Sequence, residues 1–272
     1  MGNKIWDFQN GISTRRNKSN AIWFDCPEEA LRWLYQPGTV MHEDFLTYQA
    51  DMSGWDTLTD SGSVAGADIS TGGLALTTAA SSNSYAYAIF GNGKTGMVSL
   101  ANGGRAWFEA RVKVSAITSC AVNIGLALAG TNTFQAAGAI VDTTGASATS
   151  NGSYIMFRTV AASPSVLDAV YATDGTAAST LQAGSTGLYR ADGTTRLQAI
   201  TADTYVKVGF RFDGTMLWAY VDGKLVKEDP VRYTATNLPD GVTLTPYFGI
   251  KAFSSAARTL TVDWVAAACQ EP

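Results

Sequence analysis

Alternation of apolar and polar residues between Thr204 and Val265 is the feature that most constrains the fold. From Val206 to Phe212 every second residue is a valine or phenylalanine, the period of a strand with one buried face. Asp213-Gly214 follows at once, and a second such run ends at Asp222-Gly223. An Asp-Gly pair between two alternating runs is typical of a tight hairpin turn. This stretch therefore predicts an antiparallel meander.

The composition extends this prediction to the rest of the chain. Only 15% of the 272 residues are charged and 27 are glycine, which favours short strands joined by tight turns over a helical or disordered protein. The alternating and apolar runs amount to roughly twelve strands, enough for two stacked sheets. We expect an all-β fold, a two-sheet antiparallel β-sandwich.

Two further runs define faces of this sandwich. From Phe108 to Val114 the apolar residues point one way, while Glu109 and its polar neighbours point the other. From Val122 to Leu128 the opposite face carries small residues around Asn123. A small-sided face predicts either a concave surface or a close-packed layer above it.

Residues 1–42 do not follow the sandwich pattern, so we divide the chain into an N-terminal arm, 1–42, and a sandwich domain, 43–272. The run from Asp25 to Glu29 is typical of a helix start, with Asp25 as the capping residue and acidic residues in the first turn. Pro37-Gly38 ends this short helix.

The arm holds three of the seven tryptophans and is too short to build a core of its own. We therefore expect it to pack either on its own domain or on another protein, and the sequence favours neither of these two interpretations. We predict that it contributes the partner-binding residues, large apolar anchors with two arginines for register. These residues are Trp6, Phe8, Arg15, Arg16, Trp23, Trp33 and Leu34.

Charge and cysteine usage argue against several functions. The arm carries five Lys/Arg against four acids and the whole chain has a net charge of −4, so no nucleic-acid partner is expected. With three scattered cysteines and one histidine, neither a disulfide framework nor a metal site is predicted. The N-terminus has no signal-peptide pattern and no apolar run is long enough for a membrane span. No cofactor is predicted.

The strands resemble those of a concanavalin A-like (laminin G-like) jelly roll over about residues 43–268. The resemblance is carried by 107–114, 123–126, 218–224, 247–251 and the closing 259–265. Within that superfamily the helical arm, the opening Glu43-Asp44-Phe45 and the closing Val262-Asp263-Trp264-Val265 are similar to structural proteins of tailed bacteriophages. Such proteins are capsid decoration (cement) proteins or head fibres, often trimers.

The same fold hosts glucanases, so catalytic residues must be sought individually. Retaining β-glucanases of this architecture carry Glu-x-Asp-x-x-Glu, because two carboxylates must lie about 5 Å apart. Glu109 is the only glutamate between Glu43 and Glu228, and that motif is absent. His42 lies at the arm boundary, and it is expected to be structural or solvated and not catalytic. The Asp-Gly pairs are interpreted as turns. No catalytic residue is predicted, and the chain is expected not to be an enzyme.

The resemblance and the arm together predict a non-enzymatic virion protein. It would be made in the host cytoplasm and would decorate or cement a capsid as a homo-oligomer, with a trimer implied by the resemblance. The arm would dock on the major capsid protein or another virion subunit. The alternative is a glycan-binding module of a phage head fibre or tail that contacts the host surface.

Overall fold

The computed structural model describes residues 22–27, 31, 37–45, 54–67, 72–91, 96–128, 152–160, 163–173, 179–180, 200–226 and 230–272. Of the predicted partner-binding residues, Trp23 is among them. The other six, Trp6, Phe8, Arg15, Arg16, Trp33 and Leu34, lie outside the described residues.

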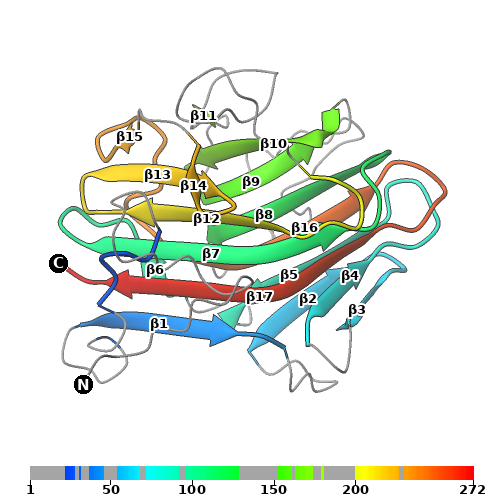
Figure 1. Cartoon of the computed structure of the whole chain (residues 1–272), viewed down its shortest axis with the longest axis horizontal. Helices are drawn as coiled ribbons and strands as arrows, with labels where there is room; N and C mark the ends of the chain where they lie inside the picture. The colour runs from blue at the N-terminus through cyan, green and yellow to red at the C-terminus, as the bar shows by residue number, and fades with distance from the viewer. Residues whose placement is uncertain are drawn as a thin grey trace.

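Nine of the described strands form one antiparallel sheet, called sheet A below, which lies toward the viewer in Figure 1. In pairing order these are β14 (Lys224–Leu225), β13 (Met216–Val221), β12 (Val206–Phe212), β7 (Arg105–Val114), β17 (Thr259–Gln270), β4 (Leu74–Thr77) and β3 (Ser63–Gly66), with β1 (Gly38–Glu43) beside β17 and β15 (Val231–Arg232) beside β13.

Eight described strands form the second antiparallel sheet, sheet B, behind it. In pairing order these are β11 (Ser179–Thr180), β10 (Ser163–Ala172), β9 (Tyr154–Val160), β8 (Cys120–Leu128), β16 (Thr243–Ala252), β5 (Tyr85–Phe90) and β2 (Trp55–Thr59), with β6 (Val98–Ser99) beside β16. The predicted two-sheet antiparallel β-sandwich is confirmed.

The main core fills the space between the sheets. Phe108 of β7 and Phe210 of β12 face inward from sheet A and are almost fully buried. Phe210 stacks on Phe157 of sheet B at a centroid distance of 4.6 Å, so the two layers are joined by direct ring packing. The alternation in β7 is as predicted, because Ala110 and Val112 are also buried in this core.

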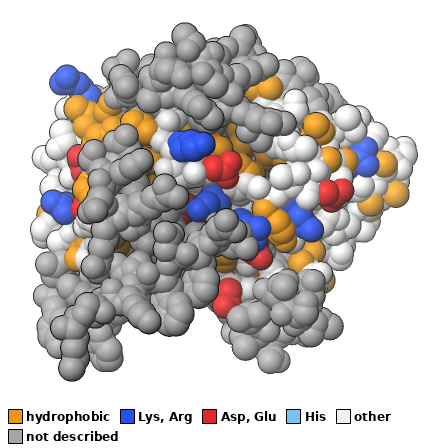
Figure 2. Space-filling view, in the orientation of Figure 1, with side chains coloured by type: hydrophobic (Ala, Val, Ile, Leu, Met, Phe, Trp, Pro, Cys, Tyr) orange, Lys and Arg blue, Asp and Glu red, His pale blue; other side chains and the backbone are white. Residues whose placement is uncertain are grey.

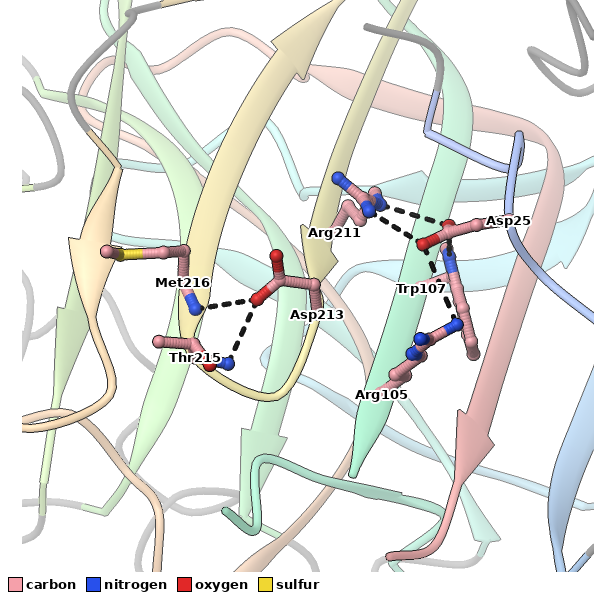
Figure 3. A network of polar contacts seen from close by, with 7 residues as sticks. All are labelled: Asp25, Arg105, Trp107, Arg211, Asp213, Thr215 and Met216. Carbon is pink, nitrogen blue, oxygen red and sulfur yellow. Dashed lines mark hydrogen bonds and ion pairs between the residues drawn. The ribbon is translucent and has the colours of Figure 1, made fainter. Parts of the chain in front are cut away.

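The Asp-Gly pairs of the closing meander form turns. Asp213 Oδ1 accepts the backbone N–H groups of Thr215 and Met216, each at 2.9 Å (Figure 3). Asp222 and Gly223 both have positive φ, 51° and 68°, as a two-residue hairpin turn with a right-handed strand twist requires. The carboxylate of Asp213 is thereby committed to a turn, as the sequence predicts.

Strand β17 links the arm side of the chain to the sandwich. It pairs with β7 on one side and, on the other, with β4 and with β1, from Gly38 opposite Gln270 to Glu43 opposite Val265. The predicted domain boundary between residues 42 and 43 thus falls inside β1.

Candidate functional site

The described part of the arm packs on the outer face of sheet A, across which it runs in Figure 1. Ile22, Trp23 and Leu31 are buried there against Trp107 and Tyr220. Gly209 leaves room for this contact, since a Cβ at that position would lie 2.5 Å from Ile22 Cδ1. Leu31 donates its backbone N–H to Pro27 O at 3.0 Å, a helical i to i−4 bond. Outside this contact, Figure 2 shows acidic and basic side chains interspersed on the visible face.

Trp23 reaches a buried carboxylate on this face. Its indole Nε1 donates to Glu109 Oε2 at 2.9 Å. Trp23 is 5% exposed and Glu109 is 0% exposed, so the hydrogen bond forms away from water and satisfies a carboxyl group that would be costly to bury without a partner. The arm was expected to pack either on its own domain or on another protein. In this structure Trp23 packs on its own domain.

Asp25, two residues after Trp23, adds a polar anchor. Figure 3 shows its contacts with Arg211, Trp107 and Arg105. Arg211 donates to its carboxylate through Nε at 3.0 Å and Nη2 at 2.6 Å. Trp107 Nε1 donates to Oδ1 at 3.1 Å, and Arg105 Nη1 lies 4.0 Å from Oδ2. The sequence predicts Asp25 as a helix cap but gives no sign of this contact with sheet A.

The Asp25 carboxylate titrates below its ordinary range. Burial alone would raise the pKa, but the hydrogen bond and charge of Arg211, with Trp107 and Arg105, hold the pKa of Asp25 below 3.8. The guanidinium of Arg211 also lies 4.4 Å from the ring centroid of Phe24. These contacts fix segment 22–27 to the sandwich. Because Asp25 and Arg211 are engaged with each other and with their neighbours, this face serves as an anchor for the arm.

The outer face of sheet B carries a different arrangement, a stack of tyrosines. Tyr85 and Tyr87 of β5 stack at 5.0 Å and 20°, and Tyr87 stacks on Tyr247 of β16 at 6.0 Å and 24°. We call these three rings the tyrosine ladder. Gly249 makes it possible, because a Cβ there would lie 2.5 Å from Tyr87 Cδ1 and 2.9 Å from the Tyr247 hydroxyl.

Polar side chains continue from the ladder across the sheet in one register row. Tyr87 is opposite Gly249, Gly249 opposite Asn123 of β8, Asn123 opposite Arg158 of β9, and Arg158 opposite Asp168 of β10. Residues in register on neighbouring strands project from the same face. Tyr87, Asn123, Arg158 and Asp168 therefore form a polar row beside the tyrosine ladder.

Two groups of the polar row are buried without a hydrogen-bond partner. Tyr87 is 3% exposed and Asn123 is 1% exposed, and neither the Tyr87 hydroxyl nor Asn123 Nδ2 is paired. A buried polar group left unpaired costs about 1–3 kcal/mol, so each of these groups needs a partner, which is either an ordered water or a ligand group. Their position in one row makes this face the strongest candidate for a ligand site among the described residues.

The titration behaviour of the row follows from its burial. Burial, with a smaller contribution from Tyr85, raises the pKa of Tyr87 well above 10.0, so its hydroxyl keeps its proton. Burial also raises the pKa of Asp168, and Arg158 opposes that shift. Apolar side chains complete the floor of the face. They are Ile89, Ala127, Tyr154, Met156, Val170 and Ala172.

Sequence reasoning found part of this face. It placed Asn123 on a small-sided strand face, but it could not align this residue with Tyr85 and Tyr87. The row depends on how β5, β16, β8 and β9 pair, and pairing partners far apart in sequence are not visible in any one strand. Gly125 is opposite Tyr247 and Gly249 is opposite Asn123. These two glycines are the sequence signal that could have pointed to the face.

Neither a metal cluster nor a membrane-spanning helix is found in the part of the chain that the structure describes. No group of three or more His, Cys, Asp or Glu side chains that could hold a metal ion occurs among those residues. No helix among them is long and apolar enough to cross a membrane.

Comparison with known proteins shows the fold. No protein-family model matches the chain, and no curated protein matches its sequence. A family-16 glycoside hydrolase from Bacteroides ovatus, in complex with a mixed-linkage glucan product, is 13% identical over 83% of this chain and 98% of its own, with a TM-score of 0.55. Peanut lectin is 11% identical over 85% of this chain and 97% of its own, with a TM-score of 0.54.

A third similar structure is described under endo-acting O-glycanases of the human gut microbiota that initiate mucin breakdown. It is 14% identical over 84% of this chain and 97% of its own, with a TM-score of 0.52. These likenesses confirm the concanavalin A-like jelly roll, which is shared by lectins and glycoside hydrolases. The bacteriophage part of the resemblance stays a prediction.

The prediction that this chain is not an enzyme is wrong as a general statement. Its structural neighbours include family-16 glycoside hydrolases. The absence of one glucanase motif therefore does not exclude enzymatic activity for a chain with this fold. Identities of 13–15% with those hydrolases show a shared fold alone. What the chain does must therefore be argued from its own residues.

Proposed function

We propose that the outer face of sheet B binds a carbohydrate. The observation that carries the proposal is the pair of buried, unpaired polar groups, the Tyr87 hydroxyl and Asn123 Nδ2, beside the tyrosine ladder. A sugar ring offers an apolar C–H face that packs on aromatic rings and hydroxyl groups that complete buried polar atoms. The likeness to lectins and glycoside hydrolases supports this choice of ligand.

The carboxylates described on this face favour binding over glycoside hydrolysis at this row. Asp56 of β2, opposite Ile89 of β5, and Asp168 of β10 project from it. Five strand spacings separate β2 from β10, roughly 24 Å at about 4.8 Å per strand. A glycosidase pair needs a separation of about 5–10 Å. The two therefore cannot act on one glycosidic bond.

Tyr87→Phe tests the proposal with two opposite readouts. The change removes the unpaired hydroxyl and keeps the ring, so the free protein should be as stable as the wild type or more stable. Carbohydrate affinity should fall about tenfold, because the bound sugar loses one hydrogen bond. A glycan array identifies a ligand first, and calorimetry and thermal unfolding then compare the variants.

Tyr233→Phe is the matched control. Tyr233 packs on Phe212 of sheet A at 6.3 Å, so this variant loses the same hydroxyl on the other sheet and should keep full affinity. An array without hits, or equal affinity losses in the two variants, would refute carbohydrate binding on this face.

The virion role is a separate proposal that rests on the resemblance to phage structural proteins. In it, residues 1–42 dock the chain, as a homo-oligomer and by resemblance a trimer, on the major capsid protein or another virion subunit. Removing residues 1–21 keeps the anchors Trp23 and Asp25, so the sandwich should fold as before. The truncated chain should no longer co-sediment with virus particles, and retained co-sedimentation would exclude docking through those residues.

A further inference from the structure

We infer that a neutral sugar ring packs on Tyr85, the most exposed ring of the tyrosine ladder, and that Asp60 accepts hydrogen bonds from its hydroxyl groups. This inference rests on the proposed function and adds the place of contact and the class of sugar. It follows from which ring of the ladder solvent reaches, which charged side chain stands beside that ring, and how the two are held together.

Exposure falls along the tyrosine ladder from one end to the other. Tyr85 is half-buried, whereas Tyr87 is 3% exposed and Tyr247 is 1% exposed. Tyr85 stacks on Tyr87 at 5.0 Å and 20°, and it packs on no other ring among the described residues. A ligand that arrives from solvent therefore meets the ladder at Tyr85, where the apolar C–H face of a sugar can extend the stack.

Asp60 stands next to Tyr85 on the same face of sheet B. Thr59, the last residue of β2, is opposite Ala86, and the backbone N–H of Asp60 donates to Tyr85 O at 3.1 Å. Asp60 thus continues the register opposite Tyr85, and residues in register project from the same face. Asp60 is exposed, and within the described part of the chain its carboxylate has no hydrogen-bond or ion-pair partner.

Ser84 holds the backbone on which Asp60 and Tyr85 stand. Its side chain is 0% exposed, and its hydroxyl donates to Asp60 O at 2.8 Å and accepts the Ala79 N–H at 2.8 Å. Losing a partner of a buried hydroxyl is costly, so this link is not easily broken. The positions of Asp60 and Tyr85 are therefore fixed before a ligand arrives, which lowers the entropy lost on binding.

The charge that this end of the face offers to a ligand is negative. Lys251 is opposite Tyr85 on β16, but it is 8% exposed and already engaged with another group. The exposed charge beside Tyr85 is the carboxylate of Asp60. A carboxylate only accepts hydrogen bonds, so it matches the hydroxyl donors of a sugar and repels a sugar acid. The fitting ligand is therefore neutral.

Asp60 has no second carboxylate at the spacing that glycoside hydrolysis needs among the described residues of this face. Asp56 is four residues earlier in the chain, on β2, which is about 13 Å in an extended strand. A glycosidase pair needs a separation of about 5–10 Å. Asp60 is therefore assigned to binding and not to cleavage of the sugar.

The test measures binding of four tetrasaccharides to the full-length protein by calorimetry. Cellotetraose, laminaritetraose and galactotetraose are neutral, and tetragalacturonate is acidic. We expect a neutral sugar to bind most tightly, and its affinity to fall about tenfold in Tyr85→Ala, which loses the stacked ring. Tyr85→Phe keeps the ring and should stay within about threefold of the wild type. Tightest binding of tetragalacturonate would overturn the assignment to a neutral sugar.

Two controls separate this contact from general effects of the substitutions. Tyr205→Ala removes a half-buried tyrosine on the side of sheet A, where the ring lies 3.9 Å from the Arg111 guanidinium, and should leave the affinity unchanged. Asp60→Asn should weaken binding about tenfold, because a hydrogen bond to a charged acceptor is lost, while Asp240→Asn should not. Equal effects within each pair would overturn the inference. If Tyr85→Ala does not fold, the comparison of Asp60→Asn with Asp240→Asn decides.

The failures of the two proposals are distinguishable. If a carbohydrate binds and Tyr87→Phe weakens it, but Tyr85→Ala and Asp60→Asn do not, the sugar lies elsewhere on the face and the inference alone is overturned. If no carbohydrate binds, the proposed function falls and the inference with it.

Discussion

Asp25 and Arg211, 186 positions apart, form a two-pronged ion pair in which Nε and Nη2 each donate to a different carboxylate oxygen, at 3.0 and 2.6 Å. Trp107 donates to the same carboxylate. The pair joins the segment before the first strand to the middle of sheet A (Figure 3). This ion pair explains why residues 22–27, which the sequence assigns to an N-terminal arm, pack on the sandwich of the same chain.

Replacing Asp25 by Asn should loosen this segment. The amide cannot accept both guanidinium hydrogen bonds and carries no charge, so we expect a loss of about 1–3 kcal/mol in the free energy of unfolding. Hydrogen exchange should accelerate first in residues 22–27. Asp240→Asn, in an exposed turn, should change the unfolding free energy by less than about 0.5 kcal/mol. Unchanged exchange in the Asp25 variant would contradict the anchoring role.

The contribution of Asp25 should depend on pH in one direction. The folded state lowers the pKa of Asp25 from 3.8, so the stabilisation is complete above the unfolded value and is lost as pH falls through the folded value. The stability difference between wild type and Asp25→Asn should be constant above about pH 5 and shrink below about pH 4. In an Arg211→Met background this loss of stability at low pH should be reduced or reversed, because burial raises the pKa of Asp25 and only Trp107 and Arg105 remain to oppose it. A difference that grows toward low pH would show the opposite sign and refute this account.

Trp23→Phe should expose the energetic role of the Trp23–Glu109 hydrogen bond. Phenylalanine keeps a ring in the pocket but removes the donor to a carboxylate that is 0% exposed. We expect the free energy of unfolding, measured with denaturant, to fall by about 1.5–3 kcal/mol. Adding Glu109→Gln should recover part of the loss, because an amide is less costly to bury than a charge. If the second change destabilises the variant further, another contact of Glu109 is the more important one.

Gly249→Ala should disturb the tyrosine ladder. The added Cβ would lie 2.5 Å from Tyr87 Cδ1, so the ring must move, at a cost of about 1–3 kcal/mol, and carbohydrate affinity should fall with it. Gly241→Ala is the control, since nothing lies within 4 Å of a Cβ there. Equal stability and equal carbohydrate affinity of the two variants would mean that Gly249 does not support the ladder.

Particular residues show where sequence reasoning succeeds and where it stops. The alternation around Phe108 predicts correctly that its neighbour Glu109 faces outward from the core. It cannot predict that Glu109 is nevertheless buried, because the cover comes from Trp23, 86 positions away. In the same way, Asn123 was placed on a small-sided face, while its alignment with Tyr87 came only from the pairing of β8, β16 and β5.

The sequence by itself determined the strands, their inward faces and the turns between them, because period-two alternation and Asp-Gly chemistry act over a few residues. The tertiary structure decided which outward side chains meet. It set Asp25 against Arg211 and aligned Tyr87, Gly249, Asn123 and Arg158, because register and sheet order join strands that are distant in the chain. Both candidate surfaces depend on those long-range pairings, so neither could be assembled from local patterns.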